Sequence, residues 1–551
     1  MPYANNMREI KVLLITSVSC PGFYIAPPIG LYRLKHYLNQ RGFGCDILDL
    51  DLCSKSEYIQ KAKEGYYNVI GFSVSHYNMT NDLEAIQEFR QIADKNCLFI
   101  AGGQEATLNY KQWLGIGLID IILMGFAEKN LYKLCVRLSK EKKCDLRDVI
   151  KNIDGTVICG RYDEFIYHPA APLTDKEFQE LSFTQIMSMD IPYENYWAKV
   201  RNEISEGNFN GNEFIIETVR LYTSSHCPRR CGFCSSQAFI PMSQNKKSPI
   251  FMLSARQIHQ LILHYVKKYR AKGFLFSDDD FPVGTPLGIK RLFDLCQLIN
   301  DSKNKGEIPK NIRFNCQARI ADFLVHKVNK KKEINQPLLE SLRVAGFNSF
   351  GLGVETFSSE LLKSKSINKV GVSEEDCRMV INALLKNELI PQINIIIGIP
   401  ESSVDELIHS MKIAAEYVRQ GCQVAVTALL KSIPGAPIYN SKDYKVKVKE
   451  WKNPVTGENL IIQDYFVPKN PVVASIAENI EELSGNELKR LKRNTPWKDS
   501  IVPKFLVGMS MFISVAKFLN RPDLIYFFEE ITNESLGRKH SRRKIMDDII
   551  L

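Results

Sequence analysis

The first part of the chain alternates short apolar runs with amphipathic stretches. Between residues 8 and 140 the apolar runs predict strands at 11–16, 45–50, 68–74, 97–103 and 119–125. Residues 29–38 and about 80–94 have the spacing of helices. Strands that alternate with helices predict a doubly wound parallel sheet of the Rossmann type. Ligands of such sheets bind at the carboxyl ends of the strands, so we expect binding residues there.

The same alternation returns between residues 214 and 440. Apolar runs there predict six strands, at 214–222, 272–277, 313–319, 349–355, 392–400 and 424–430. Six strands joined by helices favour a partial (β/α)6 barrel, in which active groups gather at the carboxyl ends of the strands. Each predicted strand ends in polar or glycine residues, as an active site at this end requires.

Two segments lack this alternation. Residues 146–213 show no clear periodicity and are predicted to be a linker, whereas residues 441–551 are charged and mostly helical. The apolar stretch Phe505–Ala516 is too short to cross a bilayer, so we expect a helix in the core, with a helix lying on a membrane as the alternative. The predicted divisions are therefore 1–145, 146–213, 214–440 and 441–551.

Composition and charge narrow the class of protein. Hydrophobic residues make up 45% and charged residues 24% of the chain, which is typical of a soluble globular protein. The net charge of +10 lies partly in basic runs without interleaved aromatic residues, so we expect solvated helix faces and not nucleic-acid binding. No signal-peptide pattern is visible, and most cysteines are scattered. A cytoplasmic location is expected, with peripheral membrane contact as an alternative.

Three cysteines stand close together in a predicted loop. Cys227, Cys231 and Cys234 are separated by three and then two residues. Thiolates are the ligands of iron–sulfur clusters, and three of them on a four-iron cluster leave one iron open to a small molecule. The alternative is a zinc site with His226 as the fourth ligand, although zinc sites more often pair two separate knuckles.

This Cys-x3-Cys-x2-Cys motif, with an aromatic residue before its last cysteine, resembles the signature of the radical S-adenosylmethionine (SAM) superfamily. The resemblance implies that Cys227, Cys231 and Cys234 hold a 4Fe–4S cluster whose open iron binds SAM. It further implies reductive cleavage of SAM to a 5′-deoxyadenosyl radical, which abstracts a hydrogen atom from a substrate.

Later segments match further motifs of the superfamily in order. Ser277, Asp278 and Asp279 stand where the resemblance places the SAM amino group, which a carboxylate suits. Arg319 corresponds to a residue that would form a fork onto the SAM carboxylate. The alternatives are that the adjacent aspartates cap a helix and that Arg319 forms a surface pair.

The adenosine half of SAM has its own candidates. Glu355, in Gly353-Val354-Glu355, resembles the glutamate that accepts hydrogen bonds from the ribose hydroxyls. Gly398 and Phe233 correspond to residues beside the adenine. In isolation, Glu355 would be read as an ordinary charge at the end of a strand.

The carboxyl ends of the strands predicted in the first domain carry Ser73, Gly102, Gly103 and Gly125. Together they resemble the cobalamin-binding domain that precedes many radical SAM domains, where glycine lets the cofactor approach the backbone. The Asp-x-His-x-x-Gly motif of many cobalamin enzymes is absent, as it usually is in the radical SAM branch, and His76 is expected to be a polar loop residue. Cobalamin is the implied cofactor.

The resemblance as a whole implies an enzyme of the cobalamin-binding branch of the radical SAM superfamily. The expected reaction is cobalamin-dependent methylation of an unactivated carbon in specialised or lipid metabolism. Alternatives are a radical rearrangement, cyclisation or carbon–carbon coupling with a structural cobalamin-type domain, and a non-catalytic zinc- or nucleic-acid-binding protein. Expected partners are a small-molecule, lipid or peptide substrate and an external one-electron reductant such as flavodoxin or ferredoxin.

Overall fold

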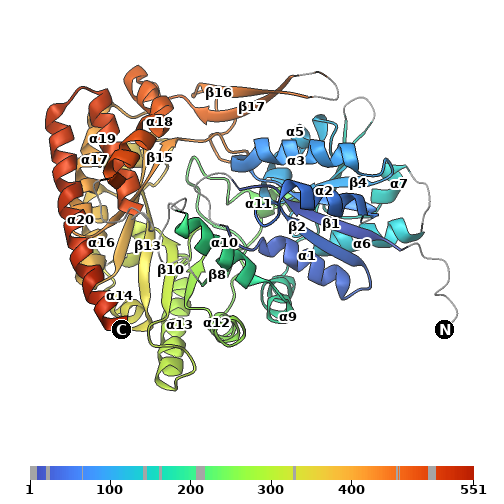
Figure 1. Ribbon diagram of the computed structural model, residues 1–551, viewed down its shortest axis with the longest axis horizontal. Coiled ribbons are helices and arrows are strands. Elements are labelled where there is room, and N and C mark those ends of the chain that lie inside the picture. The colour runs from blue at the N-terminus through green and yellow to red at the C-terminus, as the bar shows by residue number, and fades with distance from the viewer. Residues whose placement is uncertain are drawn as a thin grey trace.

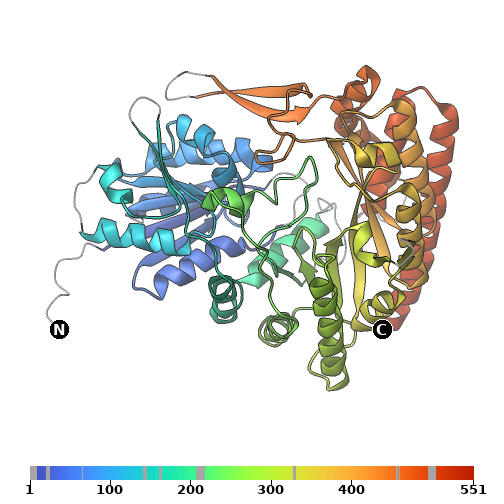
Figure 2. The same ribbon diagram turned by 180° about the vertical axis from the view of Figure 1, so that it is seen from behind.

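The computed structural model describes residues 9–19, 25–64, 66–140, 145–160, 164–206, 217–326, 331–453, 457, 459–493 and 504–550. Two sheet-containing domains lie side by side, and long C-terminal helices cover the far side of the second one (Figures 1 and 2). The predicted α/β class is confirmed.

The first domain is built on a seven-stranded sheet in the order β2-β1-β3-β4-β5-β6-β7. Its parallel part agrees with the predicted strands and consists of β1 (Lys11–Thr16), β2 (Gly44–Asp49), β3 (Val69–Ser73), β4 (Leu98–Gly102) and β5 (Ile121–Leu123). The antiparallel strands β6 (Thr156–Cys159) and β7 (Phe165–His168) extend this sheet. They belong to residues 146–213, so part of the predicted linker is sheet.

Successive side chains of a strand face opposite sides of a sheet, and both sides are covered here. Leu13 and Ile15 of β1 pack beneath α3 (Met79–Ile92) and α5 (Tyr110–Gly115), whereas Val12 and Leu14 pack beneath other helices. Those helices are α1 (Ile29–Asn39), α6 (Glu128–Lys140) and α7 (Leu146–Ile150). The sheet is therefore doubly wound, and α2 (Lys55–Glu64) also packs against α3.

Short helices lead from the first domain to the second. They are α8 (Asp175–Gln179), a π-helical turn (Glu180–Thr184), α9 (Gln185–Ser188) and α10 (Tyr193–Ser205). On α10, the Tyr196 hydroxyl donates to Asp49 Oδ2 (2.8 Å) and the Trp197 indole donates to the Thr218 carbonyl (3.3 Å). These helices thus contact both domains. The carboxyl group of Asp49 is buried at this contact, and its burial raises its pKa to about 6.

The second domain is a six-stranded, all-parallel sheet in the order β15-β14-β13-β10-β9-β8. Its strands are β8 (Thr218–Leu221), β9 (Gly273–Phe276), β10 (Arg313–Ala318), β13 (Phe347–Glu355), β14 (Ile390–Gly398) and β15 (Gln423–Leu429). The first and last strands do not pair, so the barrel is partial, as predicted. Residues 214–216 of the first predicted strand lie outside the described residues.

Helices cross between these strands and cover the outer face of the sheet. They are α12 (Ala255–Tyr269), α13 (Pro286–Asn304), α14 (Gln336–Ala345), α16 (Glu374–Lys386) and α17 (Val404–Arg419). Smaller elements are α11 (Phe239–Gln244), α15 (Ser359–Lys363), β11 (Leu324–His326) and β12 (Lys332–Ile334). Stacked phenylalanine side chains, among them Phe276, Phe281 and Phe347, are buried in the hydrophobic core of this domain.

The C-terminal region is mostly helical, with α18 (Pro471–Arg493), α19 (Lys504–Phe518) and α20 (Pro522–Ile550). The apolar helix α19 is buried, and it approaches β15 so closely that a Cβ on Gly508 would lie 2.4 Å from Val424 Cγ1. The expectation of a core helix is confirmed, and the alternative of a membrane-surface helix is wrong for this stretch. In the part of the chain that the structure describes, no helix has both the length and the apolar character to span a membrane.

An antiparallel hairpin precedes these helices and was not predicted. Its strands are β16 (Val446–Lys452) and β17 (Asn459–Phe466), and it reaches from the second domain across to α5 (Figure 1). Asn453 Nδ2 donates to the Ile116 carbonyl (2.6 Å), and Gln112 Nε2 donates to the Ile461 carbonyl (2.9 Å). We call this hairpin the strap, because it links the two domains.

Candidate active site

A cavity of about 780 Å³ lies where the carboxyl ends of the two sheets meet. Its lining comes from both domains, which lie side by side in Figures 1 and 2. Seven of the eleven residues that the sequence assigned to cofactor binding line it: Ser73, Gly102, Gly103, Gly125, Ser277, Asp278 and Asp279. Two sites predicted separately thus share one space.

The cysteine loop follows β8 at this edge. Burial raises the pKa of Cys227 to about 12 and also raises that of Cys234, whose thiol donates to Ser236 Oγ (3.4 Å). A coordinating cation reverses this effect, because it deprotonates the thiols that bind it. Cys227, Cys231 and Cys234 are half-buried and are not in the cavity lining, but their neighbours His226 and Ser236 are, so a cluster on these thiols would lie beside the cavity.

The loop is held on one side by a segment that lies far along the chain. A Cβ on Gly232 would lie 2.1 Å from the Lys365 carbonyl oxygen and 2.5 Å from that of Ser366, so only glycine fits. Gly232 N donates to the Ile367 carbonyl (3.1 Å), and Asn368 Nδ2 donates to the Arg230 carbonyl (2.6 Å). We call residues 365–368 the support segment.

On its other side the loop is held by Arg229. Its Nε donates to Asp280 Oδ2 (3.2 Å), and its Nη2 donates to the Val283 carbonyl (2.6 Å). The Asp280 side chain is fully buried, as is that of Asp322, which lies 3.8 Å from Arg229 Nη2. Arg229, which lies between the first two cysteines, thus fixes the loop to the segments that follow β9 and β10.

The adjacent aspartates at the end of β9 differ in their surroundings. The carboxylate of Asp278 is buried and accepts from the backbone and hydroxyl groups of Thr223 and Ser224, at 2.5 to 3.1 Å. Asp279 is exposed to the cavity, yet the protein encloses it closely enough that burial raises its pKa, against the effect of a hydrogen bond from Ser236. Of the two, Asp279 has the carboxylate available to a ligand.

Arg319 follows β10 and is only partly engaged. Its backbone N donates to Asp322 Oδ2 (2.6 Å), whereas its buried Nε has no hydrogen-bond partner among the described residues. A buried donor of this kind calls for a partner, and a ligand carboxylate would supply one.

Glu355 ends β13 in the left-handed region, with φ of 66°. Its Oε1 lies 2.7 Å from Lys369 Nζ, and both side chains are nearly buried. Lys369 also donates to the Gly353 carbonyl. Sequence reasoning did not find Lys369, because its position in a loop 14 residues later carries no motif.

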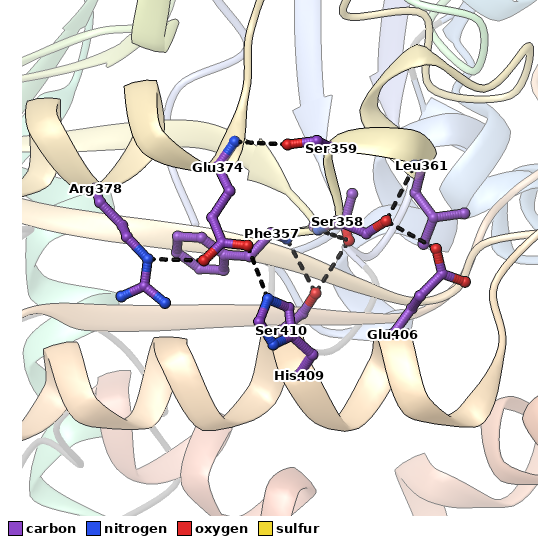
Figure 3. Close-up of polar contacts among 10 residues, drawn as sticks. Phe357, Ser358, Ser359, Leu361, Glu374, Arg378, Glu406, His409 and Ser410 are labelled. Carbon is purple, nitrogen blue, oxygen red and sulfur yellow. Dashed lines mark hydrogen bonds and ion pairs between the residues drawn. The ribbon is translucent and has the colours of Figure 1, made fainter.

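The turn after Glu355 is held in place by α17 (Figure 3). Ser410 Oγ accepts from the Phe357 backbone (3.0 Å) and lies 3.0 Å from Thr356 Oγ1, while Ser358 Oγ donates to Glu406 (2.8 Å). Figure 3 also shows Glu374 between Arg378 and His409, at 2.8 Å from each. This network fixes the strained strand end that carries Glu355.

Two assigned residues have packing roles in the structure. A Cβ on Gly398 would lie 2.7 Å from the Ala428 carbonyl oxygen and 3.2 Å from Ala477 of α18. Phe233 is partly buried against the core of the second domain. Phe233, Arg319, Glu355 and Gly398 are not part of the cavity lining.

The first domain offers room for a flat, bulky ligand. Gly103 and Gly125 have φ of 102° and 68°, which favours glycine, and a Cβ on Gly125 would lie 2.8 Å from Ser243 Oγ. The lining continues to Gly71, Ile100 and Leu123 inside the sheet, so the cavity has an apolar recess. These features fit cobalamin.

The residues named in other interpretations are placed differently. His76 Nδ1 lies 3.5 Å from Glu105 Oε2, and His76 is not in the cavity lining. His226 Nδ1 lies 2.9 Å from Ser225 Oγ, within hydrogen-bond distance. Among the described residues, no three His, Cys, Asp or Glu side chains converge as around a single metal ion.

Family models identify both domains. The model of the B12 binding domain matches residues 21–134, and that of the radical SAM superfamily matches residues 221–414. The chain therefore contains a B12-binding domain followed by a radical SAM domain, as the sequence predicts. A search among curated proteins found no match.

Two solved structures share the whole arrangement. One is the radical S-adenosylmethionine methyltransferase TsrM from Kitasatospora setae with cobalamin and a 4Fe–4S cluster bound, with a TM-score of 0.61 at 13% identity over 95% of this chain and 99% of that one. The other is the cobalamin-dependent S-adenosylmethionine radical enzyme OxsB with aqua-cobalamin bound, with a TM-score of 0.62 at 15% identity over 97% and 81%. At such identities the likeness shows a common fold.

Proposed function

We propose that this protein is a cobalamin-dependent radical SAM enzyme that methylates an unactivated carbon of a substrate in specialised or lipid metabolism. One observation carries the proposal: the glycine-rich edge of a B12-binding domain and the cysteine loop edge of a radical SAM domain face a single cavity. Two cofactors in one enclosed space would allow a substrate to meet both without water between them.

In this proposal Cys227, Cys231 and Cys234 hold the 4Fe–4S cluster. When bound, the cluster with SAM supplies a 5′-deoxyadenosyl radical, and cobalamin supplies the methyl group. Arg229 and the support segment fix the loop, so that the three thiolates keep one geometry. Asp278 secures the turn that leads into the loop.

The remaining polar residues would bind SAM. Asp279 faces the cavity and would accept hydrogen bonds from the SAM ammonium group, near Ser277. The unpartnered Nε of Arg319 would donate to the SAM carboxylate. Glu355, fixed by Lys369, would accept from the ribose hydroxyls, and Phe233 and Gly398 would lie near the adenine.

The strand ends of the first domain would hold cobalamin. Gly102, Gly103 and Gly125 line the cavity beside Ser73, so they would lie against the corrin ring. The apolar recess at Gly71 would take an aromatic ring attached to the corrin.

The test is anaerobic turnover after reconstitution with iron, sulfide and cobalamin, with SAM, a reductant and a cell extract as the source of substrate. We expect 5′-deoxyadenosine together with S-adenosylhomocysteine, because methyl transfer consumes a second SAM. Deoxyadenosine alone would instead indicate a rearrangement, cyclisation or coupling reaction.

The cysteine loop is tested by Cys231→Ala, which should reduce 5′-deoxyadenosine to background because the cluster loses one of its three thiolates. Cys159→Ala removes an exposed thiol from β6 and should leave the yield unchanged. Deoxyadenosine formation by Cys231→Ala at the level of the unmodified protein would refute the proposal.

A further inference from the structure

A hydrogen bond joins the two cofactor-binding edges directly. Gln104 follows Gly102 and Gly103 and begins α4 (Gln104–Leu108), where it lines the cavity. Its Nε2 donates to Ser235 Oγ at 3.0 Å. Ser235 is buried and directly follows Cys234, the last cysteine of the loop. A side chain beside the predicted corrin site thus contacts the predicted cluster site.

The next residue continues this connection on the SAM side. Ser236 Oγ lies 3.4 Å from Cys234 Sγ, and the Ser236 hydroxyl donates to Asp279. The serine pair therefore has one member bonded to the first domain, whereas the other lies beside the cysteine and is bonded to the cavity carboxylate. A shift of Gln104 would therefore move the segment that contacts Cys234 and Asp279.

Tight packing around the pair leaves the two domains little freedom to move here. Helix α4 packs on α11, which begins shortly after the serine pair. A Cβ on Gly435 would lie 2.9 Å from Leu108 Cδ2 and 3.1 Å from Ala238 Cβ. Because packed interfaces deform little, a change in the position of α4 is transmitted to the segment after Cys234.

We infer that Gln104 and Ser235 are positioning residues that couple the two cofactor sites, so that cobalamin and SAM each bind more tightly when the other is present. The inference rests on the proposed function. Cobalamin seated on Gly102 and Gly103 would fix Gln104, and the hydrogen bond would then fix Ser235 and the end of the cysteine loop. SAM would then bind beside Ser236 and Asp279 with the position of this segment already restricted, and the coupling is necessarily reciprocal.

The experiment measures the Kd of SAM for the full chain carrying the reconstituted cluster, with and without hydroxocobalamin, by anaerobic calorimetry. One neutral hydrogen bond corresponds to a factor of about 5 in an equilibrium constant, so we expect cobalamin to tighten SAM binding about fivefold. Gln104→Ala and Ser235→Ala should each reduce this factor to about 1, and the double variant should show no further change.

A matched control is available on α5, where it contacts the strap. Gln112 also donates its Nε2 across the domains, to the Ile461 carbonyl, but it does not line the cavity. Gln112→Ala should keep the fivefold factor. A second readout is the electron paramagnetic resonance spectrum of the reduced cluster, which cobalamin should alter in the unmodified protein and in Gln112→Ala but not in Gln104→Ala.

The outcomes separate the inference from the function beneath it. An unmodified protein that binds neither cobalamin nor SAM overturns both. Binding of both cofactors with the same SAM affinity in either state overturns the inference alone. So does a fivefold factor that persists in Gln104→Ala. Gln104 is exposed to the cavity, so this variant should fold, and Ser235→Gly replaces Ser235→Ala if the latter does not.

Discussion

At the scale of single residues, the shape of the cysteine loop depends on a missing side chain. Gly232 lies against the carbonyl groups of Lys365 and Ser366, closer than any Cβ allows. The Gly232 backbone also donates to Ile367. The relative positions of the three thiols therefore depend on the contact between Gly232 and the support segment as well as on the spacing of the cysteines in the sequence.

Replacing Gly232 by alanine should displace the loop. We expect a loss of stability of about 1–3 kcal/mol, as for an overpacked core position, and a lower iron content after reconstitution. Gly485→Ala is the control, because Gly485 lies within α18, where an added Cβ would meet no atom within 4 Å, and it should gain about 0.5–1 kcal/mol. Thermal denaturation and iron analysis measure both effects. Full iron content in Gly232→Ala would contradict this view of the loop.

The sequence pattern singled out the three cysteines as candidate ligands, but it did not separate the roles of the neighbouring carboxylates. Asp278, Asp279 and Asp280 are adjacent, yet they respectively anchor the turn, face the cavity and bind Arg229. The direction of each side chain depends on how the backbone bends at the end of the strand. A run of three aspartates does not predict that bend. Lys369 was not predicted either, because no motif marks its position and only the folded chain brings it to Glu355.

At the scale of elements, apolar periodicity predicted the helices and strands whose apolar side chains are buried in the core of their own domain. The parallel strands of both sheets agree with prediction, and so does the buried helix α19. The strap was missed because β16 is mostly exposed and rich in charged residues. Its apolar side chains, Trp451 among them, pack against the first domain, which lies far away in the sequence.

The contribution of the strap can be measured through Asn453. Asn453→Ala leaves the buried Ile116 carbonyl without this donor, which should cost about 1–3 kcal/mol and speed hydrogen exchange in α5. Asn459→Ala alters the same hairpin at a surface position, where the Asn459 side chain donates to Glu450, so α5 should exchange at its normal rate. Equal exchange in the two variants would show that the strap does not hold the domains together.

At the scale of the whole molecule, both domain types follow from the sequence, but their mutual orientation does not. Orientation depends on a few contacts between distant residues, such as Gln104 with Ser235 and Gly125 with Ser243. Neither pair has a sequence pattern, because a hydrogen bond or a close approach across domains needs only one suitable residue on each side. The cavity that carries the proposed function is a product of this orientation.

A cavity shared by two domains makes a prediction about ligand binding. Cobalamin at 100 times its Kd should stabilise the folded protein by about 2.7 kcal/mol, and unfolding of both domains should shift to higher temperature. Scanning calorimetry with domain-resolved hydrogen exchange would measure this, with a cobalamin-free sample as the control. If only the first domain is stabilised, the corrin does not contact the second one.

The support segment has a consequence for how the protein is made. Ser366 leaves the ribosome 134 residues after Gly232, so the cysteines emerge well before the carbonyl groups that shape their loop. At 5–20 residues per second, this interval is on the order of ten seconds. During biosynthesis, the cysteine loop therefore acquires the contacts that shape it only after about two thirds of the polypeptide has been made, and iron delivered earlier would meet three cysteines without a fixed arrangement.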